Sequence, residues 1–255
     1  LNQPDWPQFQ RAMQEEMEGQ MAKGNYSIIY RSLIPPGHQV LPAVWAMKRK
    51  RDLRTGEVIK WKVRLNLDGS RMQKGIHYDE TYAPVASWSA IRLILALVAT
   101  FNWHTIQLDY VQAYSQAPVE RELYMEIPRG FKIKGNKPSE EYVLQLHVNI
   151  YGQKQAGRVW YKHLTKGLIK KVGFTQSKID ECIFYKGKSI YVLYTDDSIL
   201  TGPDKQELDQ IVKDIQQAKL NITMEGEVTS FLGVTIDRQS DGTIKFSQPL
   251  LIKKI

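Results

Sequence analysis

The sequence predicts an α+β fold built on an antiparallel sheet. Strand-like and helix-like runs are mixed along the chain without a regular strand–helix–strand alternation. Residues 190–200 form two apolar runs on either side of a short polar turn, which is typical of a buried hairpin. The chain has 255 residues, of which 42% are hydrophobic and 24% charged, enough for one large domain or two small ones.

Several classes of protein are excluded by composition. The longest clean apolar run, residues 93–99, is too short to cross a bilayer, and no signal peptide is visible at the start. A single cysteine, Cys182, excludes an internal disulfide framework and indicates a reducing, intracellular compartment. The five histidines form no ligand-spaced cluster, which argues against structural zinc. The chain begins at Leu1 and stops within an apparently structured stretch, so we expect a piece of a longer polypeptide.

Positive charge is concentrated in one segment. Residues 48–74 contain ten Lys or Arg and three acids, a net charge of +7 out of +8 for the chain. The basic residues alternate with apolar ones, which predicts a β-ribbon with one apolar and one positive face, turning near residues 54–56. Such a face attracts the phosphates of a nucleic acid or a nucleotide, although a solvated surface is the alternative.

Hydrophobic periodicity and capping residues place the other elements in chain order. The expected helices are 5–22 (with Phe9, Met13, Met17 and Met21 on its packed stripe), one from Ser87 or Ser89 through Val98, 111–115, 157–171, and one from Asp204 toward Leu220. The expected strands are 105–109, 123–127, 142–148, the two flanking 195–197, 221–226, 231–237 and 243–247.

Adjacent carboxylates stand at the turn of the apolar hairpin. Asp196 and Asp197 follow one buried strand and precede the other, so two negative charges are forced together. Such a pair is favourable when a cation neutralises it, although many Asp-Asp turns are only turns. Asp109 ends the short strand 105–109 and can provide a third carboxylate, or it can simply cap a helix beginning at Val111.

Three carboxylates can hold two magnesium ions, which together activate a 3′-hydroxyl and stabilise a leaving pyrophosphate. The acids and the basic ribbon together therefore favour nucleotidyl transfer.

These residues occur within a series of segments that resembles the reverse-transcriptase domain of copia-type (Pseudoviridae) retrotransposon polyproteins, from about Trp6 to Ile255. The matching segments are, in order, WAMKRK (45–50), WKVRL (61–65), YDETYAPV (78–85), QLDYVQAY (107–114), YMEIPRGF (124–131), YGQKQ (151–155), YTDD (194–197) and FLG (231–233).

The resemblance implies a right-hand polymerase fold of fingers and palm, with an antiparallel palm sheet and packed helices. It implies the following division: 1–30 an N-terminal helical segment, 31–104 fingers with interleaved elements near 132–165, 105–245 palm, and 246–255 the start of the thumb or connection.

It also implies residue roles. Asp109, Asp196 and Asp197 would be catalytic and bind the metal ions. The nucleotide-binding residues would be Arg49 and Lys62 on the triphosphate, with Arg64 a further candidate, Tyr114 as the steric gate under the sugar, and Gln155 near the 3′-hydroxyl. As alternatives, Tyr114 and Trp160 could be core aromatics and Arg64 a surface charge.

Four positions depart from the family pattern. Thr195 stands where Val is usual, residues 66–68 replace a stretch ending in Lys, Gln153 replaces Leu, and Gly157 replaces a Pro. The stretch at 66–68 could weaken template contact, and Gly157 could loosen the start of the helix that follows. From the resemblance we expect the thumb to be cut near its beginning, and we expect no RNase H, integrase or protease segment within these residues.

The resemblance implies an RNA-directed DNA polymerase with two Mg²⁺ ions, or Mn²⁺ in their place. Its partners would be an RNA template, a DNA primer and deoxynucleoside triphosphates, with no membrane. The resemblance also implies a wider context. It includes the integrase and RNase H segments of the polyprotein, DNA integration, a possible homo-oligomer and a cytoplasmic virus-like particle. The alternatives are an inactive nucleic-acid-binding remnant and a metal-dependent nuclease.

Overall fold

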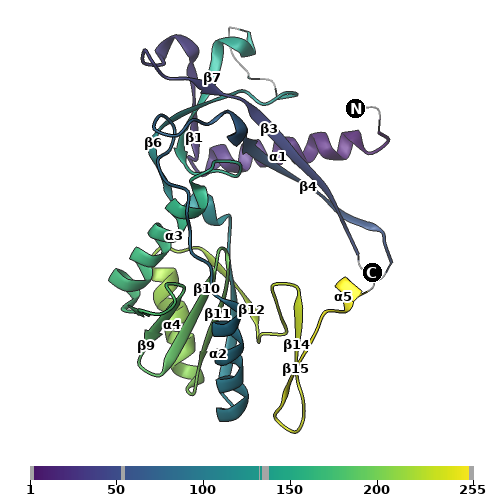
Figure 1. The fold of residues 1–255 in the computed structure, drawn as a ribbon. Helices are drawn as coiled ribbons and strands as arrows, with labels where there is room; N and C mark the ends of the chain where they lie inside the picture. The colour runs from purple at the N-terminus through teal and green to yellow at the C-terminus, as the bar shows by residue number, and fades with distance from the viewer. Residues whose placement is uncertain (1–2, 53–54, 132, 134–137, 253–255) are drawn as a thin grey trace. The chain divides into compact units, whose positions relative to one another are not determined.

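A computed structural model describes residues 3–52, 55–131, 133 and 138–252. The chain forms two compact units, each made from two segments distant in sequence (Figure 1). Unit 1 comprises Leu1–Tyr82 and Tyr114–Trp160, and unit 2 comprises Ala83–Ala113 and Tyr161–Ile255. Both units combine helices with mainly antiparallel sheets, so the α+β prediction is confirmed. The division into fingers, palm and thumb stays a prediction.

Unit 1 contains a four-stranded sheet of strand order β1-β7-β6-β2, in which only the β2–β6 pair is parallel. Its strands are β1 (Tyr26–Tyr30), β2 (Val40–Leu41), β6 (Pro118–Glu126) and β7 (Tyr142–Val148). Strands β6 and β7 bury consecutive residues, and Leu41, Met125 and Leu144 are among the fully buried ones. They form one hydrophobic core with Leu65 and Leu67.

The predicted basic ribbon is present as β3 (Ala43–Arg51) paired with β4 (Val58–Leu67). Its turn falls partly on residues 53–54, which lie outside the described residues.

Helix α1 (Trp6–Ala22) confirms the predicted N-terminal helix, but one position of its packed stripe was wrong. Phe9, Met13 and Met17 are buried as predicted, whereas Met21 is 47% exposed. Gln20 is buried in its place, because the stripe advances by three residues after Met17 rather than four.

The predicted helix at 111–115 was wrong. Only a short 3-10 turn, Ala113–Gln116, follows strand β5 (His104–Tyr110). Gln112 has a φ of 51°, and this left-handed backbone conformation interrupts an α-helix at its start. Further 3-10 turns lie at Arg31–Leu33, Gly69–Arg71 and Ser139–Glu141.

Unit 2 is organised around a six-stranded antiparallel sheet of order β12-β5-β11-β10-β9-β8. Its other strands are β8 (Thr175–Gln176), β9 (Ile183–Lys186), β10 (Ser189–Tyr194), β11 (Asp197–Gly202) and β12 (Ile222–Gly226). A second sheet contains β13 (Ser230–Phe231), β14 (Val234–Arg238) and β15 (Ile244–Ser247). The predicted strand 231–237 is divided because Leu232 and Gly233 both have positive φ, 51° and 79°.

The helices of unit 2 begin at the predicted caps. The Ser87 hydroxyl accepts the Ala90 N–H at 3.1 Å, which selects Ser87 over Ser89 as the cap of α2 (Trp88–Phe101). The Asp204 carboxylate accepts the Gln206 N–H at 2.8 Å and caps α4 (Lys205–Gln217). Helix α3 (Ala156–Gly167) begins in the last residues of unit 1, continues into unit 2 and is extended by a π-turn at Leu168–Val172. A short helix, α5 (Pro249–Ile252), also belongs to unit 2.

Among the described residues, no helix has the length and apolar character that crossing a membrane requires.

Candidate active site

The three predicted carboxylates meet at one end of the six-stranded sheet of unit 2. Strands β10 and β11 are joined by a two-residue turn, Thr195 and Asp196. Asp197, the first residue of β11, lies directly across from Asp109 of β5. The Tyr110 N–H donates to the Asp196 carbonyl at 3.0 Å, so the turn itself is joined to β5. Antiparallel pairing thus brings together acids that are almost ninety positions apart in the chain.

The hairpin turn has an unusual backbone. Thr195 has a φ of 57°, in the left-handed region that a β-branched residue rarely adopts. A positive φ at the first central residue is what a tight two-residue hairpin turn requires. The conformation costs about 1–3 kcal/mol, which the flanking strand pairs of the hairpin offset. The acids are therefore held by a strained turn on a rigid scaffold.

A buried hydroxyl network connects the strands that carry the acids. The Tyr110 and Tyr191 hydroxyls lie 2.7 Å apart, and the Tyr191 hydroxyl donates to Ser198 Oγ at 2.7 Å. All three residues are buried, and Tyr110 and Ser198 each follow one of the candidate metal ligands, Asp109 and Asp197. Sequence reasoning missed this network; polar hydroxyls within otherwise aliphatic strands were the available indication.

A fourth carboxylate lies near the three that were predicted. Glu225 belongs to β12, which pairs with β5, and its Oε2 accepts the Gln107 side-chain N–H at 2.7 Å. The β12 register shifts between Met224 and Gly226, so the pairing is irregular where Glu225 stands. Sequence reasoning missed Glu225, because only the pairing of β12 with β5 reveals it.

The carboxylates strongly affect one another. Partial burial, which contributes most, and the negative charges of Asp196, Asp109 and Glu225 together raise the pKa of Asp197 from 3.8 to about 6. Among the described residues, no Lys or Arg forms an ion pair with Asp196 or Asp197. A bound cation would relieve the repulsion between these carboxylates.

The oxygen donors fit a hard divalent cation such as Mg²⁺. Asp109, Asp196 and Asp197 are the residues that could hold it. Within the described ranges, no three His, Cys, Asp or Glu side chains are already gathered as ligands. Repulsion between like charges keeps carboxylates apart when no cation neutralises them.

The raised pKa predicts how the stability of the metal-free protein depends on pH. The folded-state pKa of Asp197, about 6, lies above its unfolded value of 3.8. The contribution of the protonated Asp197 carboxyl to the free energy of unfolding is therefore fully present below about pH 4. It is lost as the pH rises through about 6. After allowance for solvent screening, we expect a loss of roughly 1–2 kcal/mol.

Urea unfolding at pH 5 and pH 7.5, with a chelator present, measures this loss. We expect Asp197→Asn to be more stable than the wild type at pH 7.5 and to show a flatter pH profile. Identical profiles for both proteins would contradict the mutual repulsion of the acids.

Unit 1 carries the five predicted nucleotide-contact residues, beginning with the ribbon. The register of β3 with β4 places Lys48 opposite Lys62 and Ala46 opposite Arg64. Lys48, Lys62 and Arg64 therefore lie on the same face of the ribbon. Arg49 pairs with Trp61 and belongs to the other face. Arg49 and Lys62, predicted to grip the same triphosphate, thus project from opposite faces of the ribbon.

Arg49 is held by the start of helix α1. Its Nε and Nη2 atoms donate to the Asp5 carboxylate at 2.6 and 2.8 Å, and the Trp61 indole N–H donates to the same carboxylate at 2.7 Å. The Arg49 guanidinium also lies 5.3 Å from the centre of the Phe9 ring. The hydrogen bonds from Arg49 and Trp61 keep the pKa of Asp5 well below its usual value. The role of Arg49 in binding the triphosphate stays a prediction.

Arg64 and Tyr114 both contact the ring of Tyr151. The Arg64 guanidinium lies 4.4 Å from the centre of that ring, and the Tyr114 ring centre lies 5.1 Å from it at an angle of 60°. Gln155 is 4% exposed, and its side-chain oxygen has no hydrogen-bond partner in the described part of the chain. Trp160, at 1% exposed, is a core aromatic.

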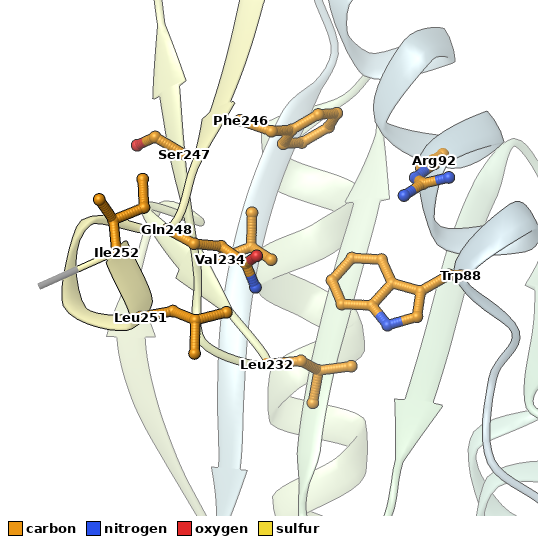
Figure 2. Close-up of a pocket in the computed structure, with 9 residues that line it drawn as sticks. All are labelled: Trp88, Arg92, Leu232, Val234, Phe246, Ser247, Gln248, Leu251 and Ile252. Atoms are coloured by element: carbon orange, nitrogen blue, oxygen red, sulfur yellow. The ribbon is translucent and has the colours of Figure 1, made fainter. Parts of the chain in front are cut away.

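Unit 2 also contains an open pocket of about 670 Å³ (Figure 2). Trp88 and Arg92 of α2 line one side, and the Arg92 guanidinium lies 5.9 Å from the Trp88 ring centre. Leu232, Phe246 and Leu251 are among the apolar residues facing them. The lining contains no carboxylate, so this pocket is separate from the acids.

A family model and several individual proteins match this chain, and they point to the same family. Residues 26–255 match the model of the family described as reverse transcriptase (RNA-dependent DNA polymerase). The chain is 32% identical, over 94% of its length, to the retrovirus-related Pol polyprotein from transposon TNT 1-94 of Nicotiana tabacum. It is 31% identical, over 92% of its length, to the corresponding polyprotein from transposon RE1 of Arabidopsis thaliana.

A more distant relative is the transposon Ty1-H Gag-Pol polyprotein of Saccharomyces cerevisiae, 26% identical over 56% of this chain and 8% of the polyprotein. The chain spans only 18% of the tobacco polyprotein and 16% of the Arabidopsis one.

Proposed function

Because this chain belongs to the reverse-transcriptase family of Ty1/copia-type retrotransposon polyproteins, we propose that it is an RNA-directed DNA polymerase. The primer 3′-hydroxyl would attack the α-phosphate of a deoxynucleoside triphosphate and release pyrophosphate. The observation that carries the proposal is the meeting of Asp109, Asp196 and Asp197 at one sheet end, where burial and mutual repulsion raise the pKa of Asp197.

We assign the metal-binding role to these three acids. When bound, two Mg²⁺ ions (or Mn²⁺) would activate the 3′-hydroxyl and neutralise the leaving pyrophosphate. The β10–β11 hairpin and the contact between the Tyr110 and Tyr191 hydroxyls would hold the strands that carry the carboxylates, which would limit backbone reorganisation during the reaction.

The residues of unit 1 would bind the incoming nucleotide. In the right-hand description, the β3–β4 ribbon belongs to the fingers and the six-stranded sheet to the palm. Lys62, on the exposed face, would neutralise the triphosphate, with Arg64 on the same face. Tyr114 would exclude a 2′-hydroxyl. The Gln155 side-chain oxygen, which has no hydrogen-bond partner among the described residues, could accept a hydrogen bond from the nucleotide.

The wider biology is proposed by analogy with the family. An RNA template, a DNA primer and deoxynucleotides would be the substrates. The rest of the polyprotein would supply integrase and RNase H, and the work would take place in a cytoplasmic virus-like particle. A homo-oligomer is compatible with this proposal.

Two variants distinguish the roles of the residues on the two faces of the ribbon. Lys62→Ala should raise the KM for a deoxynucleotide about 10-fold with little effect on Tm, because it removes an exposed charge that contacts phosphate. Arg49→Ala should mainly lower the Tm, because it leaves Asp5 without its ion pair.

Steady-state kinetics and thermal unfolding of both proteins check this difference. A larger KM increase for Arg49→Ala than for Lys62→Ala would restore Arg49 as the main triphosphate contact.

Primer extension on poly(rA)–oligo(dT) tests the polymerase function. We expect extension with Mg²⁺ or Mn²⁺ that stops when EDTA is added. Template cleavage without deoxynucleotides would instead indicate a nuclease, which explains neither Tyr114 nor the basic ribbon. Template binding with no extension under either metal would favour an inactive nucleic-acid-binding remnant.

A further inference from the structure

Tyr151 occupies a position at which two backbone segments cross. Its carbonyl accepts the Leu67 N–H at 2.9 Å, and Tyr151 forms a parallel bridge with Asn66. A Cβ on the next residue, Gly152, would lie 2.0 Å from the Leu67 carbonyl oxygen. The Tyr151 backbone is thus fixed to the end of β4 by contacts too close for a side chain.

The side chain of Tyr151 joins two of the predicted nucleotide-contact residues. Arg64 covers its ring at 4.4 Å, and Tyr114 meets it at 5.1 Å in an edge arrangement. Both geometries are favourable, the first as a cation–π contact and the second as a T-shaped aromatic pair. All three side chains are only partly exposed, which limits their freedom to reorient.

A steric gate works only if its ring cannot move away. The 2′-hydroxyl that distinguishes a ribonucleotide is a small group, and a shift of about 1 Å in the residue facing it is enough to change discrimination. Tyr114 lies in a single 3-10 turn, Ala113–Gln116, rather than in a helix. The residue before this turn, Gln112, has a positive φ. A short turn of this kind provides little local rigidity, so the Tyr114 ring needs support from outside its own segment.

We propose that Tyr151 is a positioning residue that holds the Tyr114 ring, with Arg64 fixing the Tyr151 ring in turn, and that it thereby sets selectivity for deoxyribose over ribose. This inference rests on the proposed polymerase function and on the gate role of Tyr114. Tyr151 acts through Tyr114 and need not contact the nucleotide itself.

Selectivity measurements test the proposal in the active protein. The ratio of kcat/KM for dTTP to that for UTP is measured on poly(rA)–oligo(dT) for each variant. Tyr114→Ala should lower the ratio by about 100-fold and Tyr151→Leu by about 10-fold. The double variant should resemble Tyr114→Ala alone, because Tyr151 has no effect once the gate is absent. Tyr151→Phe keeps the ring and should restore the wild-type ratio.

Tyr142 provides a matched control in the same unit. Its ring stacks on that of Tyr30 at 5.0 Å, so Tyr142→Leu also removes one aromatic pair. Tyr142→Leu should lower the Tm without changing the selectivity ratio. Equal changes in the ratio for Tyr151→Leu and Tyr142→Leu, or an unchanged ratio for Tyr151→Leu, would overturn the proposal.

A second measurement does not require polymerase activity. Tyr114 is replaced by 3-fluorotyrosine, and its ¹⁹F resonance is compared in the wild type, Tyr151→Leu and Tyr142→Leu. We expect a shifted or narrowed resonance only in Tyr151→Leu, where the Tyr114 ring loses its contact with the Tyr151 ring. If the wild type does not extend a primer, the polymerase function and the selectivity role fail, while the ¹⁹F result still decides whether Tyr151 holds Tyr114. An unchanged ¹⁹F resonance in Tyr151→Leu would overturn that contact.

Discussion

We expect Asp196→Asn to reduce deoxynucleotide incorporation by about 10³-fold or more, while binding of the template–primer changes by less than about twofold. The substitution keeps the size of the side chain and removes one negative charge from the group formed with Asp109 and Asp197. Binding of nucleic acid depends mainly on basic groups, so it should survive. Primer extension and a salt-matched binding assay measure the two properties separately.

The control for this experiment is Asp209→Asn in the same unit. Asp209 pairs with Lys205 on the exposed surface of α4, one turn apart, so its neutral variant should keep full activity. The fold should also be retained in Asp196→Asn, because loss of one charge relieves repulsion at Asp197. Incorporation by Asp196→Asn at more than about a tenth of the wild-type rate would refute the metal-binding assignment.

The second large effect is on stability. Gly152→Ala should destabilise the protein by at least about 3 kcal/mol, or prevent folding. Gly152 has a φ of 88°, and its added Cβ would lie 2.0 Å from the Leu67 carbonyl oxygen, a backbone atom that cannot rotate away. Gly69 approaches from the other side, since its own Cβ would lie 2.1 Å from the Gly152 carbonyl oxygen. Denaturant unfolding measures the change.

Gly19→Ala is the matched control. Gly19 is exposed inside helix α1, and no atom lies within 4 Å of an added Cβ. Alanine should therefore stabilise the protein by about 0.5–1 kcal/mol, because helix propensity rises and no contact is strained. A Gly152→Ala protein as stable as Gly19→Ala would show that the two backbone segments can separate without loss.

Local patterns in the sequence determined most of the elements. Apolar periodicity located α1, α2, α4 and the strands around the Asp-Asp turn, and side-chain oxygens identified Asp204 as a cap. The meeting of the strand-end acid Asp109 with Asp196 and Asp197 was also predicted, because all three were expected at strand ends. The helices, strands and caps depend on neighbours within one or two turns of chain, which a single sequence displays directly. The pairing that brings Asp109 opposite Asp197 depends on segments distant in the chain.

Tertiary structure alone decided the rest. Gln20 rather than Met21 is buried because the body of unit 1 selects which face of α1 is covered. Arg49 lies on the α1 side of the ribbon because strand register assigns faces and Asp5 is there to pair with it. Glu225 joins the acids, and Tyr151 joins Arg64 to Tyr114, through contacts between segments distant in the chain. Such contacts depend on register and on backbone crossings, which local preference does not specify.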